Sequence, residues 1–247
     1  GVMAATTVRL DAARRVLARF GGGAHADREV AAIREALNQE EGRWSELFRG
    51  GYGRALMVGS LLAVFSQFSG INAIMYYGPE VFQAAGAGRD AAFVHTVTVG
   101  AINVVFTFVA IGLVDRAGRR ALLLVGTAVQ TLAHAVVGWC FVTGRSDGLL
   151  LGAILLFVGA FAMAMGPVSW IVNAEIFPTK LRGRAMAVSI FLLWLACYLV
   201  SQTFPMLLEW VGPGRTFWIY SVFSLLSFFF VLAMVPETKG RTLEEVQ

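Results

Sequence analysis

Long apolar segments separated by short polar loops dominate the sequence after about residue 55. Six of them contain no Lys, Arg, Asp or Glu, and each reaches the length of about 20 residues that a helix needs to cross roughly 30 Å of hydrocarbon. The predicted spans are Ala55–Tyr77, Ala91–Val114, Ala121–Thr143, Leu149–Val172, Ala185–Leu208 and Thr216–Val235. A membrane β-strand is about half this long and alternates in polarity, so we interpret the segments as helices.

The composition agrees with this interpretation. Of the 247 residues, 57% are hydrophobic and 15% are charged, whereas an ordinary globular domain has about 45–50% apolar and about 25% charged residues. Two cysteines are too few for a small secreted domain held together by disulfides. We therefore predict an all-α, polytopic membrane protein.

The Lys and Arg residues are unevenly divided between the two sets of loops. Of the 20 such residues, only Arg89, Arg145 and Arg215 lie in the loops after the first, third and fifth spans. The positive-inside rule therefore predicts that both termini are cytoplasmic. The net charge of +4 then reflects topology, so no nucleic-acid partner is predicted.

The first 54 residues lack an apolar run long enough to span a membrane. Apolar residues at helical spacing predict an amphipathic helix over Arg9–Phe20, and Asp27 is expected to be the N-cap of a second short helix bearing Val30, Ile33 and Leu37. These helices are expected at the cytoplasmic face, packed either on protein or on anionic lipid. The predicted organisation is a cytoplasmic segment, a six-helix bundle and a cytoplasmic tail, over residues 1–54, 55–235 and 236–247.

The six spans divide into two sets of three, each with a cytoplasmic loop that combines acid and base. Asp115 and Arg116 belong to the first loop, and Glu175 and Arg182 to the second. Weak internal repetition of this kind is typical of secondary transporters, which predicts an inverted 3+3 repeat. Topology alone explains the basic residues, whereas the acids beside them favour ion pairs that hold helix ends together.

Three amide side chains fall near the middle of predicted spans. Gln67 and Asn72 lie in the first span and Asn103 in the second, and an amide in hydrocarbon is costly without a partner. Gln67 and Asn72 would point about 140° apart on an ideal helix, but unwinding at Gly70 between them would bring both amides to one cavity. Hydrogen bonds that merely join helices are the alternative.

Two tryptophans are candidates for the same cavity, because an indole offers a flat apolar face and one N–H donor. Trp194 lies near the middle of the fifth span, and Trp170 lies nearer the end of the fourth. His95 and His134 have no acidic partner within a span and are expected to pack or to bond to the backbone. The sequence has no clustered carboxylates, metal-ligand spacing or nucleophile beside a base, so no enzyme, metal site or cofactor is predicted.

Five motifs occur in a fixed order along the chain. They are Gln67-Phe-Ser-Gly-Ile-Asn72-Ala-Ile-Met-Tyr76-Tyr77, Asp115-Arg-Ala-Gly-Arg-Arg120, Gly166-Pro-Val-Ser-Trp170, Glu175 with Arg182-Gly-Arg184, and Pro236-Glu-Thr-Lys-Gly-Arg241. Together they resemble the sugar porter family of the major facilitator superfamily. That family has twelve spans, and this chain resembles its C-terminal half, spans seven to twelve.

The resemblance implies roles for individual residues. Gln67, Asn72, Asn103 and Trp170 would line a sugar site, and Tyr76 and Tyr77 would belong to an extracellular gate. Asp115, Arg116, Glu175 and Arg182 would form a cytoplasmic salt-bridge latch. The chain departs from the family at Ser66, where a glutamine is usual, and at Leu193, where an amide often precedes the tryptophan.

The leading hypothesis is the C-terminal half of a sugar porter in the cell membrane, moving a monosaccharide or polyol by alternating access. Its expected partners are the sugar or polyol, membrane lipid and an N-terminal half, supplied by missing sequence or by a second chain. The alternative hypothesis is a sugar sensor or binding remnant without transport, and the substitutions at Ser66 and Leu193 favour it.

Overall fold

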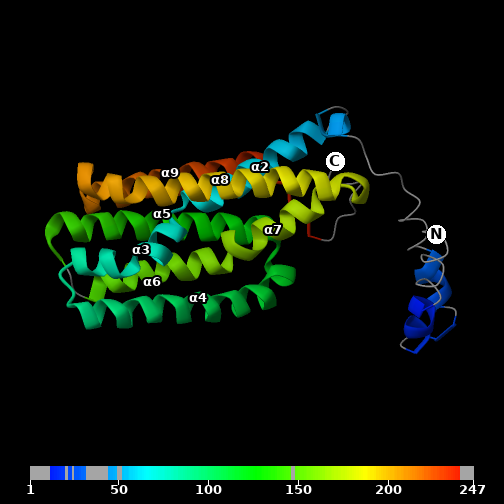
Figure 1. Cartoon of the computed structure of the whole chain (residues 1–247), viewed down its shortest axis with the longest axis horizontal. Helices are drawn as coiled ribbons and strands as arrows, with labels where there is room; N and C mark the ends of the chain where they lie inside the picture. Colours follow the sequence, from blue (N-terminus) through cyan, green and yellow to red (C-terminus); the bar gives the residue numbers. More distant parts are fainter. Residues whose placement is uncertain are drawn as a thin grey trace. The chain divides into compact units, whose positions relative to one another are not determined.

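The computed structural model describes residues 12–19, 22–23, 25–31, 44–48, 52–145 and 148–239. The chain divides into two compact units, one formed by residues 1–43 with 179–181 and the other by residues 44–178 with 182–247. All regular elements in the described residues are helices. Residues 44–54, expected in the N-terminal segment, belong to the larger unit, which is a helical bundle (Figure 1).

The bundle consists of one short 3-10 helix followed by α-helices that run back and forth along it (Figure 1). The elements are η1 (Trp44–Phe48), α2 (Tyr52–Phe68), α3 (Ile71–Ala84), α4 (Arg89–Ala117), α5 (Arg119–Thr143), α6 (Gly148–Met163), α7 (Met165–Glu175), α8 (Thr179–Val211) and α9 (Pro213–Met234). Among the described residues, six stretches are long and apolar enough to cross a membrane. The six predicted spans are therefore confirmed, and most continue for a few residues beyond their predicted ends.

Two of the spans are broken near their middle. The first divides into α2 and α3 at Gly70, whose φ of 84° is left-handed and is readily adopted by glycine. The predicted unwinding at this residue is confirmed. The fourth span divides into α6 and α7 at Ala164, two residues before Gly166. Pro167 falls in the first turn of α7, where the missing N–H leaves no intrahelical bond unmade.

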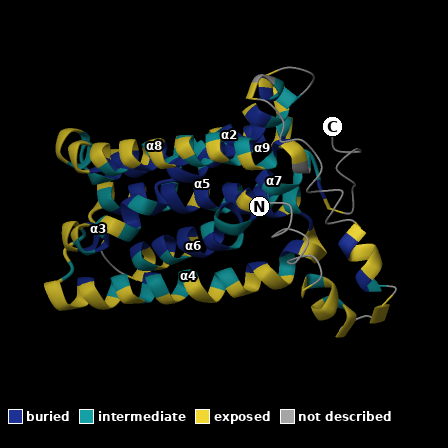
Figure 2. Ribbon diagram, turned by 45° about the vertical axis from the view of Figure 1, so that its right-hand side comes forward, coloured by how far each residue is buried: buried dark blue, intermediate teal, exposed yellow. Residues whose placement is uncertain are grey.

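Helix α5 lies inside the bundle, and α4 lies on its outside. Figure 2 shows α5 mostly buried or intermediate and α4 largely exposed. Half of the apolar window of α5 is buried (50%), against 17% of that of α4. Small residues permit close packing around α5, because a Cβ added at Gly126 would overlap the Ala164 methyl group, and one at Gly138 would overlap Trp218. The outer face of α4 carries apolar side chains, such as Val97, Phe108 and Ile111, that no other described residue covers.

The N-terminal unit contains helical residues 12–19, 22–23 and 25–31. Of the helix predicted over Arg9–Phe20, the structure describes residues 12–19, which are helical. Asp27 lies inside the helical stretch and not at its N-cap. Its carboxylate accepts a hydrogen bond from Arg14 Nε at 2.6 Å, and this bond holds the pKa of Asp27 below its usual value. Ile33 and Leu37 lie outside the described residues.

Candidate functional site

A cavity of about 320 Å³ lies beside the break between α2 and α3. Its lining comes from four of the six spans and consists of Ser66, Gln67, Ile71, Asn72, Met75, Tyr76, Asn103, Phe161, Met165, Gly166, Trp170, Leu193 and Trp194. The five residues predicted to bind substrate all belong to this set, as does Tyr76. Gln67 and Asn72, on either side of the helix break, therefore share one space with Asn103 of the second span.

The amides of Gln67 and Asn72 are hydrogen-bonded to each other. Asn72 Nδ2 donates to Gln67 Oε1 at 2.6 Å, which the left-handed turn at Gly70 makes possible. Gln67 Nε2 donates to Ser66 Oγ at 3.1 Å, and the Ser66 hydroxyl donates to the Ala63 carbonyl oxygen at 2.7 Å. A continuous polar chain thus runs from the backbone of α2 into the cavity.

Aromatic side chains stand at the open side of the cavity. Trp194 is 61% exposed, and Tyr76 and Trp170 are also exposed. Tyr77, expected beside Tyr76 in a gate, does not line the cavity. Its hydroxyl donates to the Ser201 carbonyl oxygen at 3.0 Å. The two neighbouring tyrosines therefore have different surroundings, and α3 is kinked at Tyr77, whose φ and ψ of −113° and 22° are not helical.

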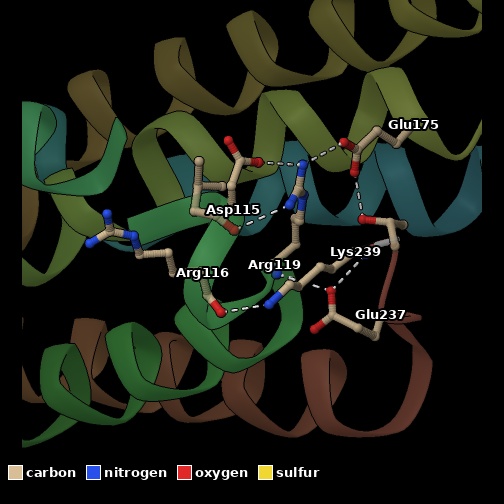
Figure 3. A network of polar contacts seen from close by, with 8 residues as sticks. Asp115, Arg116, Arg119, Glu175, Glu237 and Lys239 are labelled. Atoms are coloured by element: carbon tan, nitrogen blue, oxygen red, sulfur yellow. Dashed lines mark hydrogen bonds and ion pairs between the residues drawn. The ribbon is translucent and has the colours of Figure 1, made fainter. Parts of the chain in front are cut away.

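A cluster of charges lies at the end of the bundle where α4 and α7 stop and α5 starts; we call it the charged end (Figure 3). One guanidinium nitrogen of Arg119 lies 3.1 Å from Asp115 Oδ1 and 3.0 Å from Glu175 Oε1. The side chains of Arg119 and Glu175 are 13% and 33% exposed, so water screens this pair less than it screens a surface pair. Asp115 is 79% exposed, so water screens its pair with Arg119 more strongly. Arg119 thereby joins the last turn of α4 to the last residue of α7.

The cation at the centre of this cluster is Arg119, whereas Arg116 and Arg182 were expected there. Arg116 contributes its carbonyl oxygen, which accepts a hydrogen bond from Lys239 Nζ at 2.6 Å, while its side chain points away from the cluster (Figure 3). The guanidinium of Arg182 donates to the Phe177 carbonyl oxygen at 3.4 and 3.5 Å. Arg119 takes the central place because it is the first residue of α5.

The segment after α9 completes the charged end. The Glu237 carboxylate accepts the backbone N–H groups of Arg119 and Arg120 at 3.0 and 3.1 Å. These are the first two residues of α5 and have no intrahelical partner, and the positive end of the helix dipole favours an anion there. Thr238 Oγ1 donates to Glu175 Oε2 at 2.5 Å. The start of the expected tail is therefore tied to α5 and α7.

The model of the sugar (and other) transporter family matches residues 5–247 of the chain. The chain belongs to that family. It is 40% identical over 237 residues to the arabinose-proton symporter of Bacillus subtilis, covering 95% of this chain and 51% of the symporter. It is 38% identical over 241 residues to the D-xylose-proton symporter of Escherichia coli K12, covering 95% of this chain and 49% of the symporter.

Solved structures agree with this assignment. The proton:xylose symporter XylE of the major facilitator superfamily, bound to 6-bromo-6-deoxy-D-glucose, superposes with a TM-score of 0.79 at 37% identity, over 94% of this chain and 50% of that one. The inward-open xylose transporter XylE from Escherichia coli gives 0.76 at 36%, over 96% and 49%. This chain is thus a multi-pass membrane protein that spans about half the length of the relatives it matches.

The sequence does not predict the apolar part of the cavity lining. Phe161 and Met165 line the cavity beside the break at Ala164, but apolar residues in an apolar span carry no signal of their own. In the sequence, Glu237 is distinguished only as part of the last of the five motifs. Its position shortly after the last span, as an acid among basic residues, was the available signal. Within the described residues, no group of three or more His, Cys, Asp or Glu is placed to hold a metal ion.

We expect Glu237→Ala to lower the thermal stability of the purified chain, because two N–H groups at the start of α5 lose their acceptor. A charge at a helix terminus contributes about 0.3–1 kcal/mol, and up to about 2 kcal/mol in partly buried geometry. The measurement is the melting temperature in detergent. The matched control is Glu209→Ala, since Glu209 is exposed near the end of α8. Equal melting temperatures for the two variants would contradict the capping role.

Proposed function

We propose that this chain is the C-terminal half of a carrier that moves a monosaccharide or polyol across the cell membrane by alternating access. The observation that carries the proposal is the cavity, where amides from α2, α3 and α4 and tryptophans from α7 and α8 surround one space. Amides exchange hydrogen bonds with hydroxyl groups, and an indole face packs against the C–H face of a sugar ring. The names of the related arabinose and xylose symporters support the same class of substrate.

The partner that we infer for this chain is an N-terminal half, as missing sequence or as a second chain. The cavity is open on the side where Trp194 is exposed, so an unaccompanied bundle would leave the amides facing lipid. Helices α4 and α8 also carry large exposed apolar side chains, including Phe108 and Phe191. A second half would close the cavity, and lipid would cover the remaining apolar surface.

Alternating access would then consist of the two halves rocking around the cavity, with the three-plus-three arrangement of spans as an inverted repeat. The charged end would act as the latch, because Arg119 joins the ends of α4, α5 and α7. We propose that this end and both termini face the cytoplasm, since the Lys and Arg residues concentrate in its loops. The chain would act as a carrier and would catalyse no reaction.

The sugar site is tested by binding of D-xylose and D-glucose to the chain co-expressed with the N-terminal half of a family member. We expect Gln67→Ala to weaken binding by roughly three- to tenfold or more, because one hydrogen bond contributes about 0.5–1.5 kcal/mol. The control is Gln202→Ala, because Gln202 is exposed on α8 and does not line the cavity. If the double variant Gln67→Ala, Asn72→Ala is expressed normally and binds sugar with unchanged affinity, these amides only join helices and do not bind the ligand.

Orientation is tested by the side from which an introduced cysteine reacts with a membrane-impermeant maleimide. Asp147→Cys is expected to react from outside the cell, because it follows the third span. Asp115→Cys is expected to react only in inside-out vesicles, because it lies at the charged end. The opposite pattern of labelling would reverse the proposed topology.

The latch is tested by removing the charge of Glu175, which lies 3.0 Å from Arg119. We expect Glu175→Gln to shift the population toward the inward-open state, because ion pairs that exist only in the closed state favour that state. The measurement is the distribution of distances between spin labels on the two halves at the charged end. Glu209→Gln is the control, and the same distribution in both variants would mean that Glu175 has no latch function.

A further inference from the structure

Asn72 has both hydrogens of its side-chain amide engaged within the protein. Nδ2 donates to Gln67 Oε1 at 2.6 Å and to Cys197 Sγ at 3.1 Å. One acceptor lies in α2 and the other in α8, so Asn72 is held between two spans. Because a primary amide carries two N–H donors, Asn72 in this arrangement has only its carbonyl oxygen, Oδ1, left for a ligand.

The orientation of this amide follows from the hydrogen bonds that precede it. The Ala63 carbonyl can only accept, so the Ser66 hydroxyl hydrogen is directed to it. Ser66 Oγ then accepts from Gln67 Nε2, which leaves Gln67 Oε1 facing Asn72. An oxygen there requires a donor, so Asn72 presents Nδ2. The opposite orientation of Asn72 would place two carbonyl oxygens against each other.

Besides Gln67, the orientation of the Asn72 amide depends on Cys197, whose sulfur accepts its second hydrogen bond. Its side chain is almost fully buried, at 5% exposure, and it does not itself line the cavity. Thiol sulfur is a weak acceptor, but without it one N–H of Asn72 would have no partner in an apolar environment, which is costly. The thiol therefore keeps the second hydrogen of Asn72 turned away from the cavity.

We propose that Cys197 is a positioning residue that sets the hydrogen-bond polarity of the cavity, so that Asn72 accepts from the ligand and does not donate to it. This inference rests on the proposed sugar-binding function. It narrows the ligand to one that carries an O–H donor at the position facing Asn72. Hydroxyl groups of sugars and polyols meet this condition, whereas a carbonyl, an ether oxygen or a fluorine at that position does not.

The experiment compares monodeoxy and monodeoxyfluoro analogues of D-xylose and D-glucose, because fluorine accepts a hydrogen bond and cannot donate one. Binding is measured for the chain co-expressed with a complementary N-terminal half. At one ring position we expect both analogues to bind roughly three- to tenfold more weakly than the parent sugar. In Cys197→Ala the freed N–H reaches the cavity, so at that position the deoxyfluoro analogue should recover relative to the deoxy analogue.

Two further variants make the test specific. Cys197→Ser keeps an acceptor at the same place, so it should retain the unmodified chain's ratio of deoxyfluoro to deoxy affinity. Cys140→Ala is the matched control, because Cys140 is a buried cysteine of α5 that does not line the cavity, and it should leave the ratio unchanged. A ratio altered equally by Ser and Ala at position 197 would overturn the role of the acceptor.

The outcomes separate this inference from the proposed function. If the parent sugars do not bind to the unmodified chain, the proposed function fails and the inference fails with it. If they bind, but Cys197→Ala weakens every analogue by the same factor, sugar binding stands and Cys197 is merely structural. Recovery of one deoxyfluoro analogue in Cys197→Ala alone supports the inference, since a general loss of packing would not favour one ring position.

Discussion

A backbone group in the middle of an apolar span must find a hydrogen-bond partner within the protein, since hydrocarbon offers none. The break at Gly70 meets this constraint locally. The N–H of Gly70 donates to the Gln67 carbonyl oxygen at 3.0 Å, and the Ser69 hydroxyl donates to the Ser66 carbonyl oxygen at 2.6 Å. With the backbone satisfied, the turn can redirect α3 so that Asn72 meets Gln67. The polar side of the cavity depends on this turn.

The sequence predicted those parts of the structure that have an energetic signature along the chain. Spans were found because a charge in hydrocarbon is expensive, so charge-free stretches mark them. Gln67, Asn72 and Asn103 stood out for the same reason, and Gly70 between the first two indicated where the helix could break. The confirmed features are those marked by a single residue, either because its side chain is costly to place in hydrocarbon or because its backbone can leave the helical conformation.

Contacts between side chains on different helices could not be predicted from the sequence, because they depend on which helices pack against each other. The pattern around Asp115 contains several arginines, and only the geometry of the turn at Gly118 decides that Arg119 reaches Glu175. Tyr77 resembles Tyr76 in sequence but faces Ser201. The bond from Asn72 to Cys197 joins residues in two different spans, and a cysteine in an apolar span has no distinguishing pattern. The break at Ala164 lacks a glycine at the broken position.

The mutual hydrogen bond of Gln67 and Asn72 also bears on the part of a transport cycle in which nothing is carried. In the proposed carrier the binding site must also return empty, and in that step its binding groups pass through a closed, poorly hydrated state. Amides that depended on cargo for their hydrogen bonds would resist this return, because each unpartnered group would be penalised. Amides that satisfy each other lower that barrier, and the same bond must then be weak enough for hydroxyl groups to compete with it. A stronger bond between the amides would speed the return of the empty site but weaken ligand binding, and a weaker bond would do the opposite.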